Sequence, residues 1–326
     1  MDLPLDTGLK IGLQTLHRRT EPATGSWLPR IDDLLAWVAL VERCGYDSVW
    51  VGDHLAFTTP ILDPLLTLAQ AAVASRRLLL GTGVYLLPLR HPALVAKQVA
   101  TLYHLSEGRL IFGVGVGGEF PKEYEVSGVP LTQRGARLSE SLAVLRLLWR
   151  GEEVSHRGRF FAFDRVRMLP PPRQAGGPPI WCGGRAPAAL RRTGRLADGW
   201  ISYVVTPEMY AAGLAAIADT AAAAGRRLDR FGTGHLLFVR LDDSYEKALD
   251  VAGEVLSRRY AMDFRRAARR YAALGRAAEI AERVRAFYAA GVRHLILDLL
   301  GPYEERPHGA ERFAAEVLPL IADLRG

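Results

Sequence analysis

The chain has 326 residues, of which 49% are hydrophobic and 24% are charged, so it can bury a sizeable core and is not intrinsically disordered. Its formal net charge of +7 permits attraction to anionic ligands, but no module combines stacking aromatic residues with basic ones, and no nucleic-acid partner is expected. The apolar run at residues 78–89 is broken by Gly and Pro well short of the roughly 20 residues of a membrane span, so no membrane partner is expected either.

The chain start and the cysteines bear on location. The first six residues contain two acids and no basic segment before an apolar run, so no secretion signal is predicted. Cys44 and Cys182 are the two cysteines, and a distant pair in a core-forming chain favours reduced thiols over a disulfide framework. A cytoplasmic location is therefore expected.

Short apolar strands alternate with amphipathic helices along the chain. Strands are expected at residues 9–13, 48–51, 78–84, 109–114, 179–182, 199–204, 235–241 and 294–299. Helices are expected at residues 32–44, 63–75, 92–105, 132–149, 186–193, 207–225, from the seventh strand to about 271, at 277–290 and at 311–324. Eight strand–helix units predict a (β/α)8 TIM barrel; a doubly wound sheet is the alternative, because it gives the same local alternation.

One segment interrupts this alternation before the fifth strand. Residues 152–178 carry aromatic residues in a short-strand pattern and the run Pro170-Pro171-Pro172. Strand–helix alternation resumes after the segment, which favours an inserted hairpin over a domain boundary. Residues 1–326 are therefore expected to form a single barrel domain.

The end of the second strand carries an acid and an imidazole side by side, Asp53 and His54. In a TIM barrel the active site lies at the C-terminal ends of the strands. The carboxylate can accept hydrogen bonds, and the imidazole can exchange a proton near neutral pH. The pair is a candidate catalytic site; the alternative is that Asp53 begins a loop and His54 caps the next element.

Three further strand ends are rich in glycine. The segment 81–84, Gly-Thr-Gly-Val, indicates a bulge, a close approach of a ligand or a strained strand exit. Gly183 and Gly184 open a helix next to Arg185, which suits a phosphate group or a tight turn.

The glycine-rich loop at residues 113–119 follows the fourth strand and fits G-x-G-x-x-G. It is not interpreted as a dinucleotide fingerprint, because that motif closes the first strand of its unit and needs an acid about 20 residues on, which here falls in a helix. The glycines can still let a flat ring or phosphates lie against the chain. Glu119 is a candidate proton donor or acceptor, or else a solvated loop acid.

No cluster of Cys, His or Glu has metal-ligand spacing, and no G-x-S-x-G elbow is present, so no metal is expected and redox chemistry would need a bound cofactor. In their order and spacing, the motifs resemble the bacterial luciferase-like superfamily of flavin- and deazaflavin-dependent oxidoreductases. The Asp53–His54 pair most resembles its branch that uses coenzyme F420. The resembling segments are 45–54, 81–84, 90–92, 97–98, 105–110, 113–119, 134–137, 179–184 and 197–200.

The resemblance implies hydride transfer between coenzyme F420 and a small organic substrate, with a homodimer as the expected assembly. His54 would be a proton donor near the reactive carbon of the cofactor, and Glu119 an acid–base carboxylate. Asp53 would contact the deazaflavin, and the bond between Gly83 and Val84 matches a non-proline cis peptide that backs the ring. The other implied cofactor contacts are Leu86, Gly117, Gly118, Lys122, Gly183, Gly184 and Ala186.

The chain departs from the sugar-phosphate-oxidising member of that branch. Thr58 replaces a Trp, and Tyr203 and Thr206 replace the residues that hold the sugar phosphate, so a sugar-phosphate substrate is not expected. FMN-dependent monooxygenases share most of the motifs, so an enzyme that uses O2 and reduced FMN from a partner flavin reductase is the alternative. A non-catalytic flavin-binding barrel is a third interpretation.

Overall fold

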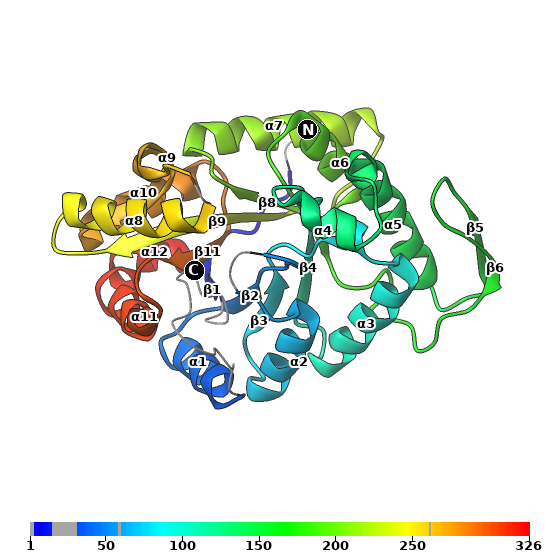
Figure 1. The fold of residues 1–326 in the computed structure, drawn as a ribbon, viewed down its shortest axis with the longest axis horizontal. Coiled ribbons are helices and arrows are strands. Elements are labelled where there is room, and N and C mark those ends of the chain that lie inside the picture. Colours follow the sequence, from blue (N-terminus) through cyan, green and yellow to red (C-terminus); the bar gives the residue numbers. More distant parts are fainter. Residues whose placement is uncertain (1–2, 15–30, 58–59, 261) are drawn as a thin grey trace.

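The computed structural model describes residues 3–14, 31–57, 60–260 and 262–326, and within them eight parallel strands close into a barrel surrounded by helices (Figure 1). Pairing between β8 and β9 closes the ring, which confirms the predicted (β/α)8 barrel and excludes an open doubly wound sheet. The strands of the ring are β1 (Lys10–Gln14), β2 (Ser48–Val51), β3 (Leu79–Thr82), β4 (Leu110–Val114), β7 (Ile180–Gly183), β8 (Gly199–Tyr203), β9 (Gly232–Leu241) and β11 (His294–Leu299).

Helices cover the outside of the barrel (Figure 1). The α-helices that follow or precede barrel strands are α1 (Ile31–Arg43), α2 (Pro64–Ala74), α3 (Pro92–Leu105), α5 (Arg134–Leu148), α6 (Pro187–Leu196), α7 (Pro207–Ala223), α8 (Tyr245–Tyr260), α10 (Ala277–Ala289), α11 (Arg306–Glu316) and α12 (Ala322–Arg325). Short 3-10 turns are η1 (Leu87–Leu89), η2 (Leu131–Gln133), η3 (Tyr303–Glu305) and η4 (Leu318–Ile321).

The structure differs from the predicted elements in several places, of which these are the main ones. A short helix, α4 (Pro121–Val126), follows the glycine-rich loop. Pro121 favours its start, because the backbone angle that proline fixes suits the first position of a helix. The helical stretch expected to run to residue 271 is split into α8 and α9 (Arg265–Tyr271) and is followed by a short strand, β10 (Ala273–Gly275), on the edge of β9. The third strand ends at Thr82, two residues earlier than expected, and α11 begins earlier than the expected residue 311.

Two tryptophans fill the interior of the barrel. Trp50 on β2 and Trp181 on β7 lie with ring centroids 5.9 Å apart, and both are buried. Glycines on other strands make room for them: a Cβ on Gly81 of the adjacent strand β3 would lie 2.2 Å from the Trp50 ring, and a Cβ on Gly232 of β9, two strands from β7, would lie 2.1 Å from the Trp181 ring. The two rings therefore fill the barrel interior, and in this fold ligands bind at the C-terminal ends of the strands.

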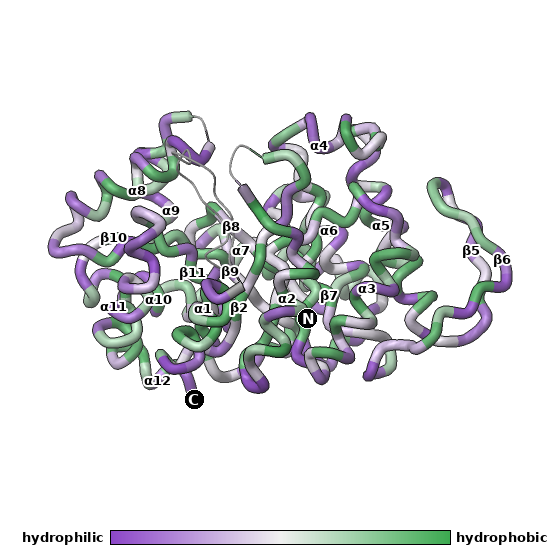
Figure 2. Tube along the Cα trace, turned by 60° about the horizontal axis from the view of Figure 1, so that its bottom comes forward, coloured by the Kyte–Doolittle hydropathy of each residue, from purple (hydrophilic) through white to green (hydrophobic). Residues whose placement is uncertain are grey.

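The predicted inserted hairpin is present between α5 and β7. It consists of β5 (Val154–Arg157) and β6 (Ala162–Val166), which pair antiparallel with a register shift between Val154 and His156. Both views show it extending from one side of the body, beyond α3 and α5 (Figures 1 and 2). In the part of the chain that the structure describes, no helix is both long enough and apolar enough to cross a membrane.

Candidate active site

A pocket of about 200 Å³ lies at the C-terminal ends of the barrel strands. It brings together most of the residues that the sequence predicted, although those residues come from different strand–helix units. The lining residues are Gly52, Asp53, His54, Ile61, Gly83, Val84, Leu86, Gly115, Val116, Gly117, Glu119, Gly183, Gly184, Ile201, Ser202, Tyr203, Leu236, Phe238 and Tyr260.

His54 lines this pocket and is held from behind by Glu123 of α4. The Nδ1 atom of His54 lies 3.1 Å from each carboxylate oxygen of Glu123. The imidazole also stacks on Phe57, with centroids 4.0 Å apart, and meets the edge of Phe120 at 5.7 Å. The ring is therefore fixed at one nitrogen and contacted by two aromatic side chains.

Glu123 is almost completely buried, with 1% of its side chain exposed. Besides His54, it accepts hydrogen bonds from the backbone N–H of Leu55 at 2.7 Å and of Ala56 at 3.4 Å. Burial alone would raise the pKa of Glu123, but the hydrogen bond and charge of His54 and the two backbone donors outweigh it and lower that pKa from its ordinary value. Glu123 is therefore a carboxylate at neutral pH.

Asp53 is also buried, and its carboxylate joins two segments of the chain. Its Oδ2 accepts from the backbone N–H of Leu86 at 2.8 Å, and its Oδ1 accepts from Nη2 of Arg90 at 2.9 Å. Burial raises the pKa of Asp53, whereas the Arg90 hydrogen bonds and charge act to lower it. The pair ties the end of β2 to the segment after β3, which carries Val84 and Leu86.

That segment contains the cis peptide between Gly83 and Val84 that the family resemblance implied. Val84 projects into the pocket between glycines of two neighbouring strand ends. A Cβ on Gly115 would lie 2.4 Å from Cγ2 of Val84, and a Cβ on Gly183 would lie 2.9 Å from its Cγ1. These glycines are needed because any larger residue would collide with the Val84 side chain.

Glu119 is exposed at the pocket mouth and accepts a hydrogen bond from the hydroxyl of Tyr203. Burial and the neighbouring Glu119 carboxylate raise the pKa of Tyr203, so its phenol keeps its hydrogen and donates it. The guanidinium of Arg185 lies over the Tyr203 ring, 5.1 Å from its centroid. No side chain caps the N-terminus of α6 after Gly184, which suits an anionic group at this end of the pocket.

Three predicted cofactor contacts do not line the pocket. Lys122 is exposed and pairs with Glu125 at 2.6 Å, Gly118 lies next to the lining residue Gly117, and Ala186 is the exposed N-cap of α6. Their roles toward a cofactor stay predictions. Thr58, where a Trp was expected, lies outside the described residues.

The sequence interpretation missed Glu123, the role of Arg90 and the apolar wall of Leu236, Phe238 and Tyr260. The available signal for Glu123 was weak: it lies four residues after Glu119 and two after Pro121, in a segment interpreted as loop. Its contact with His54 spans 69 residues, and no local pattern records such a contact.

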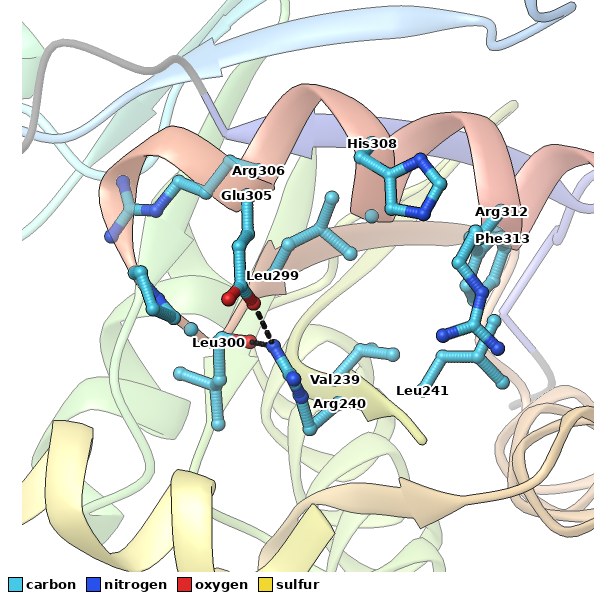
Figure 3. Close-up of a pocket in the computed structure, with 13 residues that line it drawn as sticks. Val239, Arg240, Leu241, Leu299, Leu300, Glu305, Arg306, His308, Arg312 and Phe313 are labelled. Carbon is cyan, nitrogen blue, oxygen red and sulfur yellow. Dashed lines mark hydrogen bonds and ion pairs between the residues drawn. The ribbon is translucent and has the colours of Figure 1, made fainter. Parts of the chain in front are cut away.

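A second, smaller cavity of about 60 Å³ lies between the ends of β9 and β11 and helix α11 (Figure 3). Of its three arginines, Arg240 pairs with Asp242 at 3.1 Å and with Glu305 at 3.0 Å, and Arg312 pairs with Glu316 at 2.8 Å. The third, Arg306, lies over the ring of Tyr303, 5.8 Å from its centroid. Among the described residues, no group of three or more Cys, His, Asp or Glu could hold a metal ion.

Comparison with known proteins gives consistent matches. A family model described as luciferase-like monooxygenase matches residues 9–294. The chain is 34% identical over 248 residues to 4-hydroxyprotoasukamycin monooxygenase of Streptomyces nodosus subsp. asukaensis, an alignment that covers 73% of this chain and 65% of that protein. It is 31% identical over 324 residues to F420-dependent glucose-6-phosphate dehydrogenase of Nakamurella multipartita, covering 87% of this chain and 91% of that protein.

Among solved structures, the monooxygenase RslO1 from Streptomyces bottropensis superimposes with a TM-score of 0.82 at 26% identity, covering 95% of this chain and 99% of that one. Of these three proteins, one is F420-dependent by name and two are monooxygenases by name. The chain spans just under two thirds of the length of the first monooxygenase relative.

Proposed function

Because the chain belongs to the luciferase-like monooxygenase family, we propose that it is an oxidoreductase that uses coenzyme F420 and passes a hydride between that deazaflavin and a small organic substrate. The match over residues 9–294 confirms the family inferred from the motifs and, with it, the expectation of a luciferase-like oxidoreductase. The choice of F420 is supported by the relative that aligns over 91% of its own length and is F420-dependent by name.

The observation that carries the proposal is that His54 and the Val84 bulge line one pocket. A ring cofactor fits this pocket. Glycines at positions 115 and 183 leave room for the Val84 side chain between them, so that it can support a flat ring. Gly117 also lines the pocket and has no side chain to fill it. When bound, a deazaflavin supplies the acceptor or donor of the hydride.

The proton chemistry belongs to residues of this chain. His54 takes the proton of a substrate hydroxyl during oxidation and returns it during reduction of the carbonyl. Glu119, which accepts a hydrogen bond from Tyr203, supports this transfer from the pocket mouth. Asp53 holds the segment that carries Val84 and Leu86, through the backbone N–H of Leu86.

The second candidate is an FMN-dependent monooxygenase that uses O2 and reduced FMN from a partner reductase. It is favoured by the relative with 34% identity and by the RslO1 structure with 26% identity, which are both monooxygenases by name. A non-catalytic flavin-binding barrel is disfavoured, because such a protein would not need a histidine fixed in the pocket by a buried carboxylate. We also propose a cytoplasmic homodimer; the free Cys44 and Cys182 support the location, and light scattering tests the assembly.

Titration of the purified protein with F420 and with FMN, followed by ring fluorescence, separates the two candidates. Tight binding of F420 with none of FMN supports the proposal, and the reverse result overturns it. With the cofactor chosen, His54→Ala is expected to lower kcat by about 10²- to 10⁴-fold, the usual contribution of a general acid or base. Full turnover by His54→Ala would show that His54 does not move the proton.

A further inference from the structure

Glu123 lies behind His54, and the role proposed for it rests on the proposed function of His54. We propose that Glu123 is a positioning residue that keeps the hydrogen of the neutral His54 ring on Nδ1, so that Nε2 is the nitrogen that exchanges the substrate proton. Glu123 touches neither substrate nor cofactor in this role, since it does not line the pocket.

The contact geometry selects one nitrogen of the ring. Both oxygens of Glu123 lie 3.1 Å from Nδ1 of His54, and no described residue hydrogen-bonds to Nε2. A carboxylate only accepts hydrogen bonds, so Nδ1 must carry the hydrogen. Nε2 then has its lone pair free in the neutral ring and a proton to give in the charged one.

The carboxylate itself is oriented by the backbone. The N–H groups of Leu55 and Ala56, the two residues after His54, both donate to its Oε1. Pro121 at the first position of α4 and Phe120 before it place Glu123 in the first turn of that helix, where its carboxylate reaches the loop after β2. Glu123 therefore fixes the backbone and the side chain of the same loop at once.

The ring also has little freedom to turn away from Glu123. Phe57 stacks on one face of His54 with an interplanar angle of 13°, and Phe120 approaches it nearly perpendicularly, at 87°. A flip of the ring would bring a carbon to the carboxylate in place of Nδ1 and remove one of the hydrogen bonds of this buried charge, which costs stability. Packing and hydrogen bonding thus favour the same orientation.

Glu123→Gln tests the role because the amide changes which hydrogen bonds are possible. The carbonyl oxygen of a glutamine must stay on the Leu55 N–H, since an amide NH2 there would face a donor. The NH2 then points at Nδ1 of His54 and donates to it, which moves the ring hydrogen to Nε2. The variant keeps the shape of the side chain but favours the opposite tautomer.

Nuclear magnetic resonance of ¹⁵N-histidine-labelled protein reads the tautomer without cofactor or substrate, and a His54→Gln sample assigns the signals. Spectra over a range of pH isolate the neutral ring. The wild-type protein is expected to show the Nδ1–H form of His54 and Glu123→Gln the Nε2–H form. A wild-type His54 in the Nε2–H form would overturn the proposal, and this measurement decides even if the variant does not fold.

Steady-state kinetics gives the functional half of the test. Glu123→Gln is expected to lose at least about 10²-fold in kcat, within the range of general acid–base catalysis, with the cofactor Kd changed less than twofold. Glu140→Gln is the matched control: Glu140 also holds a histidine, His156 at 3.3 Å, and backbone N–H groups including that of Phe161 at 2.9 Å, but away from the pocket. The control is expected to keep full kcat.

The outcomes separate this inference from the proposed function. Absence of turnover with either cofactor would refute the proposed function, while the tautomer of His54 would still test the role of Glu123. Turnover in the wild type together with an unchanged tautomer and kcat in Glu123→Gln would refute the positioning role alone. Equal losses of kcat in Glu123→Gln and Glu140→Gln would also refute it, because a general loss of stability would then explain both.

Discussion

The substitution Gly115→Ala tests whether the Val84 bulge is the platform for the cofactor ring. A Cβ at position 115 would lie 2.4 Å from Cγ2 of Val84, whereas ordinary contacts begin near 3.4 Å, so Val84 must move by about 1 Å. The other methyl group of Val84, Cγ1, faces Gly183, where a Cβ would lie 2.9 Å away, so the space on that side is also narrow. Overpacking of this kind costs about 1–3 kcal/mol.

If that cost is incurred where the ring binds, it corresponds to a cofactor Kd raised by about 5- to 150-fold. Fluorescence titration with the cofactor that the wild type binds measures this Kd. Val84→Ala in the same chain removes both methyl groups and with them the clash, so Gly115→Ala is expected to raise the Kd less in a Val84→Ala chain than in the wild type. Gly309→Ala is the control, since its Cβ would meet only Leu299 at 3.9 Å. A wild-type Kd in Gly115→Ala would refute the reasoning.

Two further predictions concern stability. Asp53→Asn removes one partner of a buried ion pair with Arg90 and is expected to lower the free energy of unfolding, measured by urea denaturation, by about 3–5 kcal/mol. Asp243→Asn is the control, because it breaks an exposed pair with Lys247 and should change that free energy little. Equal effects of the two substitutions would show that the buried pair does not stabilise the fold more than the exposed one. Burial lowers the pKa of His235 from 6.5 to about 3, so the unfolded chain binds the proton first and stability falls as the pH drops from about 6.5 toward 3. His235→Phe, which keeps the stacking on Phe287, should make the slope of unfolding free energy against pH shallower over that window, and an unchanged slope would show that His235 does not contribute.

The barrel could be predicted from the sequence because its signal is local and repeated. Each strand is a short apolar run followed by a helix, and the general rule for the fold then places Asp53 and His54 at the catalytic end. The pocket indeed collects both residues together with Glu119 and most of the predicted glycines. The elements that were not predicted are short: α4 has six residues and β10 has three, too few for a periodic pattern to be recognised.

The partners of the candidate catalytic residues could not be predicted for a different reason. Arg90 reaches Asp53 across 37 residues, and Tyr203 reaches Glu119 across 84 residues. These contacts exist because closure of the barrel brings separate loops to one end. The local sequence around either partner carries no signal that predicts the contact. The glycines at positions 115 and 183 show the same limit, since their purpose becomes visible only when Val84 lies between them.

Two carboxylates that follow β4, Glu119 in the glycine-rich loop and Glu123 in α4, have different surroundings and therefore different proposed roles. Glu119 and Glu123 are four residues apart. Glu119 is exposed at the pocket mouth and accepts a hydrogen bond from the Tyr203 hydroxyl. Glu123 is buried and accepts hydrogen bonds from N–H groups. An exposed carboxylate can exchange protons with water and substrate, while a buried one surrounded by donors stays ionised and orients its neighbour. The sequence alone predicted a role for Glu119; the carboxylate that contacts His54 in the structure is Glu123, four residues later.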